Sequence, residues 1–308
     1  MAKNRSGPTD FADTLIEGPW KHQFVSAGGL RFHVALTGPE DGQLVVLLHG
    51  VPQHWWSMRH LLVHLAAAGY RTAAVDLRGF GASDKPPEGY TLPMLARDVA
   101  GVIAALGHGS AVVAGQGLGG QVAWTMVSRY PDLLRGIVPI CSLHPGSTEP
   151  RRRYLVSPRA FVQVTALRSQ RAAQRLLTDA AFMRVLLATW TQESGWLDAE
   201  AARHYSGAMR QPYAAEKAAR MMRWVTRPLP TTARRRFAAS VRHPATVPVL
   251  HIQTDADPVL RWTVTQAEEF GGSDYRFELL SGLGHLPAEE DGELLANTML
   301  AWFREHGI

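Results

Sequence analysis

Short apolar runs alternate with segments of helical period along the first 143 residues. Two more apolar runs and two more helical segments follow residue 244. Eight runs have the length and apolar content of strands, at 22–26, 30–36, 44–48, 71–75, 111–114, 136–140, 247–253 and 275–280. Helical patterns occupy 55–68, 91–106, 118–130, 263–270 and 294–305. Because strands alternate with helices, the pattern predicts an α/β fold: a mostly parallel eight-stranded sheet with helices on both faces.

Between these two blocks the pattern changes to helical. Residues 144–243 carry few strand signals, and prolines interrupt the helical pattern at Pro158, Pro212, Pro228 and Pro230. We therefore expect one α/β core made of residues 1–143 and 244–308, interrupted by a helical, Arg-rich lid at 144–243. The first two strands, joined at Ala27-Gly28-Gly29, are expected to form an antiparallel hairpin at the sheet edge.

Charge is divided unevenly between these two parts. The segment 144–243 holds 18 basic and 6 acidic residues, whereas the rest holds 14 basic and 21 acidic ones. Such asymmetry can mark an anionic partner, and whether the basic lid binds one stays open. Solvated helix faces are the simpler interpretation. Basic and aromatic residues are not interleaved as in nucleic-acid modules, so no nucleic-acid partner is expected.

Composition narrows the class and the compartment. Cys141 is the single cysteine, which excludes an intramolecular disulfide. No apolar stretch has the length of a membrane span, and no apolar region follows the charged first ten residues as in a signal peptide. We expect a cytoplasmic protein. No set of His, Cys and carboxylate residues has metal-ligand spacing, so neither a metal nor a cofactor is expected.

One turn in the sequence has the layout of a nucleophile elbow. The stretch Ala111-Val-Val-Ala-Gly-Gln-Gly-Leu-Gly-Gly120 is an apolar run, then Gly-x-x-x-Gly, then the start of a helical pattern. Such a strand–turn–helix presents its middle residue at the top of a sheet. That residue is Gly117 here, and glycine has no side chain that could form a covalent intermediate. The sequence therefore predicts the scaffold of a covalent catalyst without its nucleophile.

Four motifs in order carry a family resemblance. They are His49-Gly50-Val51-Pro52, the segment 76–86 (Asp-Leu-Arg-Gly-Phe-Gly-Ala-Ser-Asp-Lys-Pro), the elbow, and a C-terminal set made of Asp257-Pro258 and Gly284-His285. Together they resemble the α/β-hydrolase superfamily, and within it the epoxide hydrolase branch of the actinobacterial type. The resemblance covers nearly the whole chain. It implies the α/β-hydrolase fold and hydrolase chemistry, while the superfamily hosts many reactions.

The resemblance also implies roles for particular residues. His285 takes the position of the catalytic base, and Asp257 that of the acid that orients it, with Asp255 as the alternative two residues earlier. The backbone N–H groups of Val51 and Leu118 correspond to the oxyanion hole. Such roles use main-chain atoms and do not depend on the nucleophile.

The chain departs from the family in two places. Epoxide hydrolases carry Asp where this chain has Gly117, and they open the epoxide with lid tyrosines. Met222 stands where one tyrosine is expected, and no tyrosine occurs near 162–167, where the other should lie. The residues that we expect to contact a substrate are His49, Pro52, Trp56, Gln116, Tyr154, Tyr205, Tyr213 and Met222.

Three functional hypotheses remain open at this stage. The first is hydrolase-type chemistry on a small apolar substrate, with a His285–Asp257 general-base dyad and the backbone oxyanion hole but no covalent nucleophile. The second is a catalytically inactive pseudoenzyme that binds a ligand or partner through the pocket and the basic lid. The third is an epoxide hydrolase whose nucleophile was removed by substitution. Substrate identity and oligomeric state are not encoded in any recognisable motif.

Overall fold

The computed structural model describes residues 10–147, 157–226, 232–261 and 267–308. Eight strands form one sheet in the order β1-β2-β4-β3-β5-β6-β7-β8. Their bounds are β1 Lys21–Ala27, β2 Leu30–Thr37, β3 Leu44–Leu48, β4 Arg71–Val75, β5 Ala111–Gln116, β6 Leu134–Ile140, β7 Val249–Thr254 and β8 Tyr275–Leu280. The pairs β1–β2 and β2–β4 are antiparallel and all other pairs are parallel. The predicted mostly parallel sheet of eight strands and its edge hairpin are confirmed.

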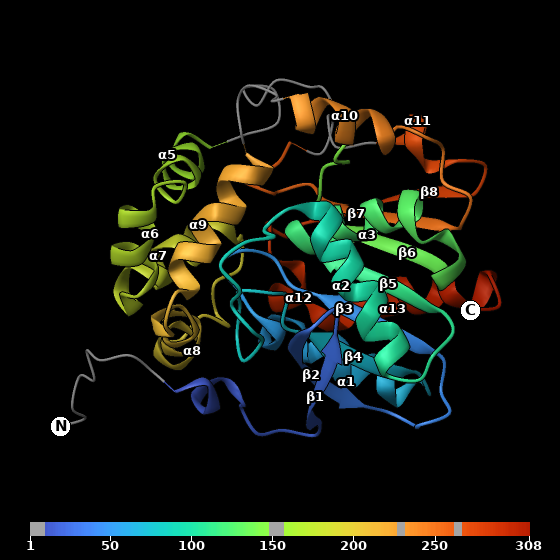
Figure 1. Ribbon diagram of the computed structural model, residues 1–308, viewed down its shortest axis with the longest axis horizontal. Helices are drawn as coiled ribbons and strands as arrows, with labels where there is room; N and C mark the ends of the chain where they lie inside the picture. Colours follow the sequence, from blue (N-terminus) through green and yellow to red (C-terminus); the bar gives the residue numbers. More distant parts are fainter. Residues whose placement is uncertain (1–9, 148–156, 227–231, 262–266) are drawn as a thin grey trace.

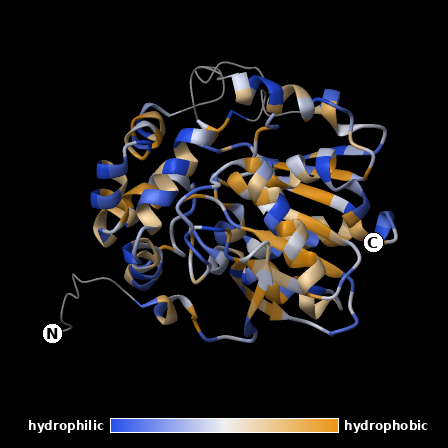
Figure 2. Cartoon of the chain, viewed as in Figure 1, coloured by the Kyte–Doolittle hydropathy of each residue, from blue (hydrophilic) through white to orange (hydrophobic). Residues whose placement is uncertain are grey.

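Burial along the strands follows from their place in the sheet. Every residue of β3, β5 and β7 is buried, because these parallel strands are covered on both faces. The edge strand β1 instead alternates between exposed and covered positions. Figure 2 shows the same contrast, with hydrophobic colour concentrated on the strands and hydrophilic colour on the outer helices.

Helices cover the two faces of the sheet. On one face lie α2 (Leu92–Ala105) and α3 (Leu118–Arg129), which pack on each other and on β1, β5 and β6. On the other face lie α1 (Arg59–Ala67) and α13 (Gly292–Glu305), which pack on each other. Each face has its own apolar cluster, with Trp124 in the first and Trp302 in the second. The remaining short elements are η1 Phe11–Thr14, η2 Trp55–Met58, η3 Pro131–Leu133, α11 Glu268–Gly271 and α12 Pro287–Glu290.

A helical insertion separates β6 from β7, and we use this name for helices α5 to α10. Their bounds are α5 Pro158–Ala166, α6 Gln170–Leu177, α7 Ala180–Trp190, α8 Ala199–Arg210, α9 Ala214–Val225 and α10 Thr232–Ser240. In Figure 1, α5 to α9 gather beside the sheet as a separate group of helices. Ser or Asp side chains cap the N-termini of α5, α6, α7 and α8, accepting hydrogen bonds from the first-turn N–H groups.

Some expected boundaries shift. The strand expected at 111–114 continues to Gln116, because Gly115 and Gln116 still pair with Pro139 and Ile140 of β6. The segment 55–68 divides into the 3₁₀ helix η2 and α1. Of the helix expected at 263–270, residues 263–266 lie outside the described residues, as do Pro228 and Pro230. None of the helices in the described ranges is long and apolar enough to span a bilayer.

Candidate active site

Gly117 occupies the sharp turn between β5 and α3. Its backbone angles are φ 54° and ψ −106°, outside the regions that residues with a side chain adopt without strain. Its N–H donates to the carbonyl of Ile140 at 2.9 Å, which ties the turn to the end of β6. The elbow predicted from the sequence is therefore present, and it is held in a conformation that costs glycine little.

The other glycines of this turn are required by packing. A Cβ on Gly115 would lie 2.3 Å from the Gly119 carbonyl carbon, and one on Gly119 would lie 2.3 Å from the Leu48 carbonyl oxygen. A Cβ on Gly117 would have His285 Nε2, at 3.8 Å, as its neighbour within 4 Å. Space at position 117 thus accommodates a side chain that would face His285, and the backbone angle is what resists one.

His285 is held by a carboxylate. Its Nδ1 lies 2.8 Å from Asp257 Oδ2, in a loop that follows β8. The Asp257 side chain is fully buried and that of His285 is 10% exposed. Because a carboxylate oxygen accepts, the ring donates from Nδ1. The lone pair on Nε2 then points away from Asp257. That nitrogen is the one that lies near Gly117.

Asp257 is itself fixed by the main chain. Its Oδ1 accepts hydrogen bonds from the N–H groups of Val259 at 2.7 Å and Leu260 at 2.9 Å. Asp255, the alternative acid, is exposed and instead accepts from Ser281 Oγ and the Gly282 N–H. Of the two carboxylates, the structure brings Asp257 to His285.

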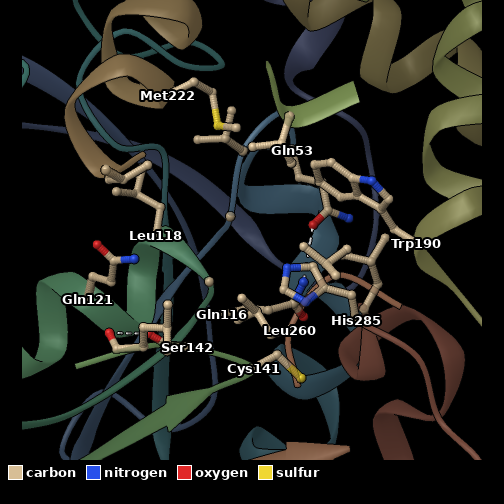
Figure 3. Close-up of a pocket in the computed structure, with 18 of the residues that line it drawn as sticks. Gln53, Gln116, Leu118, Gln121, Cys141, Ser142, Trp190, Met222, Leu260 and His285 are labelled. Carbon is tan, nitrogen blue, oxygen red and sulfur yellow. Dashed lines mark hydrogen bonds between the residues drawn. The ribbon is translucent and has the colours of Figure 1, made fainter. Parts of the chain in front are cut away.

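A cavity of about 110 Å³ opens onto this turn. Core residues Gly50, Val51, Gly117, Leu118 and His285 line it together with residues of the helical insertion. The insertion contributes the apolar Val164 from α5, Trp190 from α7, and Met222 and Val225 from α9, and Thr226 directly after α9 adds one hydroxyl. Figure 3 shows Met222 and Trp190 on the side of the cavity opposite Cys141 and Ser142. The cavity is therefore a mainly apolar space with His285 in its wall.

Val51 and Leu118, whose backbone N–H groups were expected to form an oxyanion hole, are both in this wall. Leu118 is the first residue of α3, so its N–H has no acceptor within the helix, and the positive end of the helix dipole lies there. Val51 precedes Pro52 across a cis peptide bond, and both Val51 and Leu118 line the cavity. These are the two donors expected from the sequence for an oxyanion hole.

The expected substrate contacts divide into two groups. Gln116 and Met222 line the cavity, whereas His49, Pro52, Trp56, Tyr205 and Tyr213 are absent from its described lining. His49 is buried: its Nε2 accepts from the Leu77 N–H at 3.1 Å and its Nδ1 lies 2.8 Å from the Gly50 carbonyl. Pro52 is likewise buried, and Trp56 stacks under the Arg59 guanidinium at 3.7 Å. These three residues pack within the protein outside the described cavity lining, and their contact with a substrate stays a prediction.

Two of the tyrosines that were expected to contact a substrate are absent from the described lining of the cavity. Tyr205, in α8, is fully buried and donates its hydroxyl proton to Glu289 Oε1, and burial raises its pKa well above the usual value. Tyr213 is 67% exposed at the start of α9. Tyr154 lies outside the described residues. Tyr205 and Tyr213 were expected as substrate contacts, and the structure places both elsewhere.

Cys141 stands close to the dyad. Its Sγ and ligand atoms of Asp257 and His285 all lie within 4.8 Å of one another, which is the one such cluster in the described ranges. Burial, followed by the charge of Asp257, raises the pKa of the thiol well above its usual value. A neutral thiol is a poor nucleophile and metal ligand. The His285 and Asp257 atoms are also engaged with each other, so we assign no metal to the cluster.

Gln53 and Trp190 are two of the wall residues that the sequence analysis did not name. Gln53 directly follows the His-Gly-Val-Pro motif, and that position was a usable signal. Trp190 packs edge-to-face on the His285 ring with centroids 5.8 Å apart. The backbone carbonyl of Trp190 also accepts a hydrogen bond from the backbone N–H of His285 at 2.7 Å. Nothing in the sequence around Trp190 distinguishes it from other core tryptophans.

Residues 43–291 match the family model of the alpha/beta hydrolase fold. The chain belongs to the α/β-hydrolase fold family. The matched range includes the elbow, both members of the dyad and the entire helical insertion. Gly117, Asp257 and His285 therefore lie in the segment that defines the family.

Curated relatives point to the epoxide hydrolase branch. The chain is 41% identical over 127 residues to AB hydrolase superfamily protein YfhM of Bacillus subtilis, covering 41% of this chain and 44% of that protein. It is 42% identical over 123 residues to epoxide hydrolase B of Mycobacterium tuberculosis, covering 39% of this chain and 35% of that protein. The matches span less than half the length of either relative. The chain is thus epoxide hydrolase-like in sequence.

Solved structures of the same fold cover most of the chain. Epoxide hydrolase CorEH superposes with a TM-score of 0.77 at 21% identity, covering 93% of this chain and 99% of that one. Cfl2 of Burkholderia cenocepacia superposes with a TM-score of 0.82 at 20% identity, covering 92% and 96%. At such identities the likeness establishes the α/β-hydrolase fold.

Proposed function

We propose that this protein is a hydrolase in which His285 and Asp257 direct water, without a covalent intermediate, at a small, mostly apolar acyl substrate. The observation that carries the proposal is the open space between Gly117 and His285 Nε2, where a nucleophile would otherwise stand. Nε2 takes a proton from water as its oxygen attacks the carbonyl carbon. The tetrahedral intermediate then collapses, the C–O bond to the leaving alcohol breaks, and His285 returns the proton to it.

Backbone donors support a carbonyl substrate. The N–H groups of Val51 and Leu118 suit the oxygen of a tetrahedral intermediate, whose negative charge they stabilise as it develops. Epoxide opening creates an alkoxide that needs a proton donor, and the described cavity lining offers no tyrosine hydroxyl for it. We therefore favour an ester over an epoxide, although the relatives include epoxide hydrolases.

The helical insertion would act as the lid of this site. Its α5, α7 and α9 supply the apolar wall opposite the elbow, and residues 144–243 thus correspond to a lid on a core of residues 1–143 and 244–308. A wall of Val, Trp and Met side chains favours an apolar acyl chain and excludes bulk water from the dyad.

Hydrolysis of p-nitrophenyl acetate and butyrate tests the proposal. We expect turnover by the protein as it stands and a loss of about 10²–10⁴-fold in His285→Ala, the usual contribution of a general base. His243→Ala is the matched control, because His243 is an exposed histidine outside the cavity lining. Turnover that survives in His285→Ala would remove the dyad from the mechanism.

Intact-protein mass spectrometry during turnover tests the non-covalent step. We expect no mass increase on the protein and full activity in Cys141→Ser. An acyl adduct on Cys141 would replace direct water attack with thiol chemistry.

A binding protein without catalysis is the second candidate. Two observations favour it. Position 117 has no nucleophilic side chain, and the Tyr205 hydroxyl donates to Glu289 and is absent from the described cavity lining. Absence of ester and epoxide turnover in both the protein as it stands and His285→Ala would support this candidate.

A further inference from the structure

Two buried glutamine side chains line the cavity beside the dyad. Gln53 and Gln116 are each 1% exposed, and Gln116 Nε2 donates to Gln53 Oε1 across 3.4 Å. Figure 3 draws this bond as a dashed line and labels both amides with His285 in one view. The bond is longer than a normal N–H···O bond, so the pair is only loosely satisfied.

Each amide keeps one buried atom that makes no short hydrogen bond in the described part of the chain. These atoms are Gln53 Nε2, a donor, and Gln116 Oε1, an acceptor. Buried polar atoms normally have hydrogen-bond partners, and an exception in a cavity wall calls for an explanation such as a bound group. Here the two atoms have complementary roles and lie on hydrogen-bonded neighbours.

A polar chain behind the cavity orients these amides. Arg59 bonds Glu289 Oε2 at 2.7 Å, and Tyr205 gives its hydroxyl proton to Glu289 Oε1. The Tyr205 oxygen can then only accept, and Gln53 lies close enough to lower the Tyr205 pKa, against the larger effect of burial. One N–H of the Gln53 amide is therefore directed at Tyr205 and its oxygen at Gln116, so the second N–H of Gln53 and Gln116 Oε1 are left for a ligand.

We propose that Gln53 and Gln116 form a subsite for a neutral amide, with Gln116 Oε1 accepting the ligand N–H and Gln53 Nε2 donating to the ligand carbonyl. An ionised carboxylate offers no donor to Gln116, and burying a second anion near Asp257, which is bonded to His285 in the wall of this apolar cavity, is unfavourable. A cis amide, as in a lactam, presents its N–H and C=O on one edge and satisfies both atoms together. The inference rests on the proposed function: the recognised amide would belong to the acyl substrate of the same cavity.

Equilibrium titration with ε-caprolactam and N-methyl-ε-caprolactam tests this subsite on the full chain. The N-methyl compound keeps the carbonyl and loses the N–H. We expect it to bind about tenfold more weakly, the loss of roughly one hydrogen bond. In Gln116→Leu the two lactams should bind equally. Gln121→Leu is the matched control, since Gln121 also lines the cavity and the discrimination should persist there.

Each result decides the inference. Equal binding of the two lactams to the unsubstituted protein, or binding of neither, would overturn it, as would discrimination that survives in Gln116→Leu. Thermal melting of each variant checks that it is folded. The titration needs no turnover and can be repeated in His285→Ala. Loss of esterase activity with lactam discrimination intact would therefore count against the proposed function alone.

Discussion

Restoring a nucleophile at position 117 is the most direct perturbation of this site. A Cβ built there lies 3.8 Å from His285 Nε2. A serine hydroxyl lies one further bond out, which brings it within about 2.6–3.2 Å of Nε2 in a suitable rotamer, the reach needed for general-base activation. We therefore expect Gly117→Ser to form an acyl-enzyme with p-nitrophenyl acetate.

The stability cost of this change follows from the backbone. At φ 54° and ψ −106° a residue with a Cβ stores strain of about 1–3 kcal/mol. For a chain of 308 residues that lowers the melting temperature by about 2–5 °C. The substitution should thus leave the protein folded, because no backbone atom lies within 4 Å of the added Cβ other than those of the adjoining residues.

Two variants control the measurement. Gly117→Ala carries the same strain without a hydroxyl, so it should melt like Gly117→Ser and form no adduct. Gly119→Ala places a Cβ 2.3 Å from the Leu48 carbonyl oxygen and should cost more than about 4 kcal/mol. Intact mass after quenching and the burst of p-nitrophenol report the acyl-enzyme. If Gly117→Ala is destabilised as strongly as Gly119→Ala, the steric reasoning is wrong. If Gly117→Ser folds without forming an adduct, the site lacks more than its nucleophile.

Three further perturbations test the surroundings of the site. Asp257→Asn should reduce ester turnover by about 10²–10⁴-fold, because His285 loses the partner that fixes its tautomer, while the exposed Asp255→Asn should be nearly silent in the same assay. Tyr205→Phe should destabilise the fold by about 1–3 kcal/mol in urea melts and leave kcat unchanged, because its hydroxyl serves Glu289; a large fall in kcat would contradict this. Burial lowers the pKa of His54 from 6.5 to about 3 in the folded protein. Between these two values the unfolded chain binds a proton at His54 and the folded protein does not, so the folded state loses stability as the pH falls below about 6.5. His54→Phe should reduce the slope of unfolding free energy against pH between 6 and 4 by about 1.4 kcal/mol per unit, and an unchanged slope would exclude His54 as its source.

The sheet could be predicted because its signal is local. Each central strand is a short apolar run bounded by turn residues, and the parallel strands are buried on both faces, so eight runs gave eight strands. Boundaries were less accurate where pairing with a neighbour decided them. Gly115 and Gln116 lack strand propensity and remain in β5 because β6 pairs with them.

The residues of the site divide in the same way. Asp257 and His285 follow strand ends at characteristic positions, and their pairing over 28 residues agrees with the family resemblance. Tyr205 shows the opposite case. Its partner Glu289 is 84 residues away, and no local pattern distinguishes a tyrosine that faces a buried carboxylate from one that faces a cavity. The wall formed by Trp190 and Met222 likewise depends on how helices pack across the elbow.

The contrast between Gly117 and His285 bears on whether the site catalyses a reaction or only binds a ligand. Glycine at 117 relieves backbone strain, so the absence of a nucleophile favours the fold even without any function. Asp257 also has a structural use, since its Oδ1 accepts from the Val259 and Leu260 N–H groups. The His285 side chain has no comparable use. Its ring contacts Asp257 and Trp190 and otherwise directs a free nitrogen into the cavity, and burying such a group costs stability that a leucine would not. A histidine held in this manner is what a general base requires, and it is the reason that we favour catalysis over binding alone.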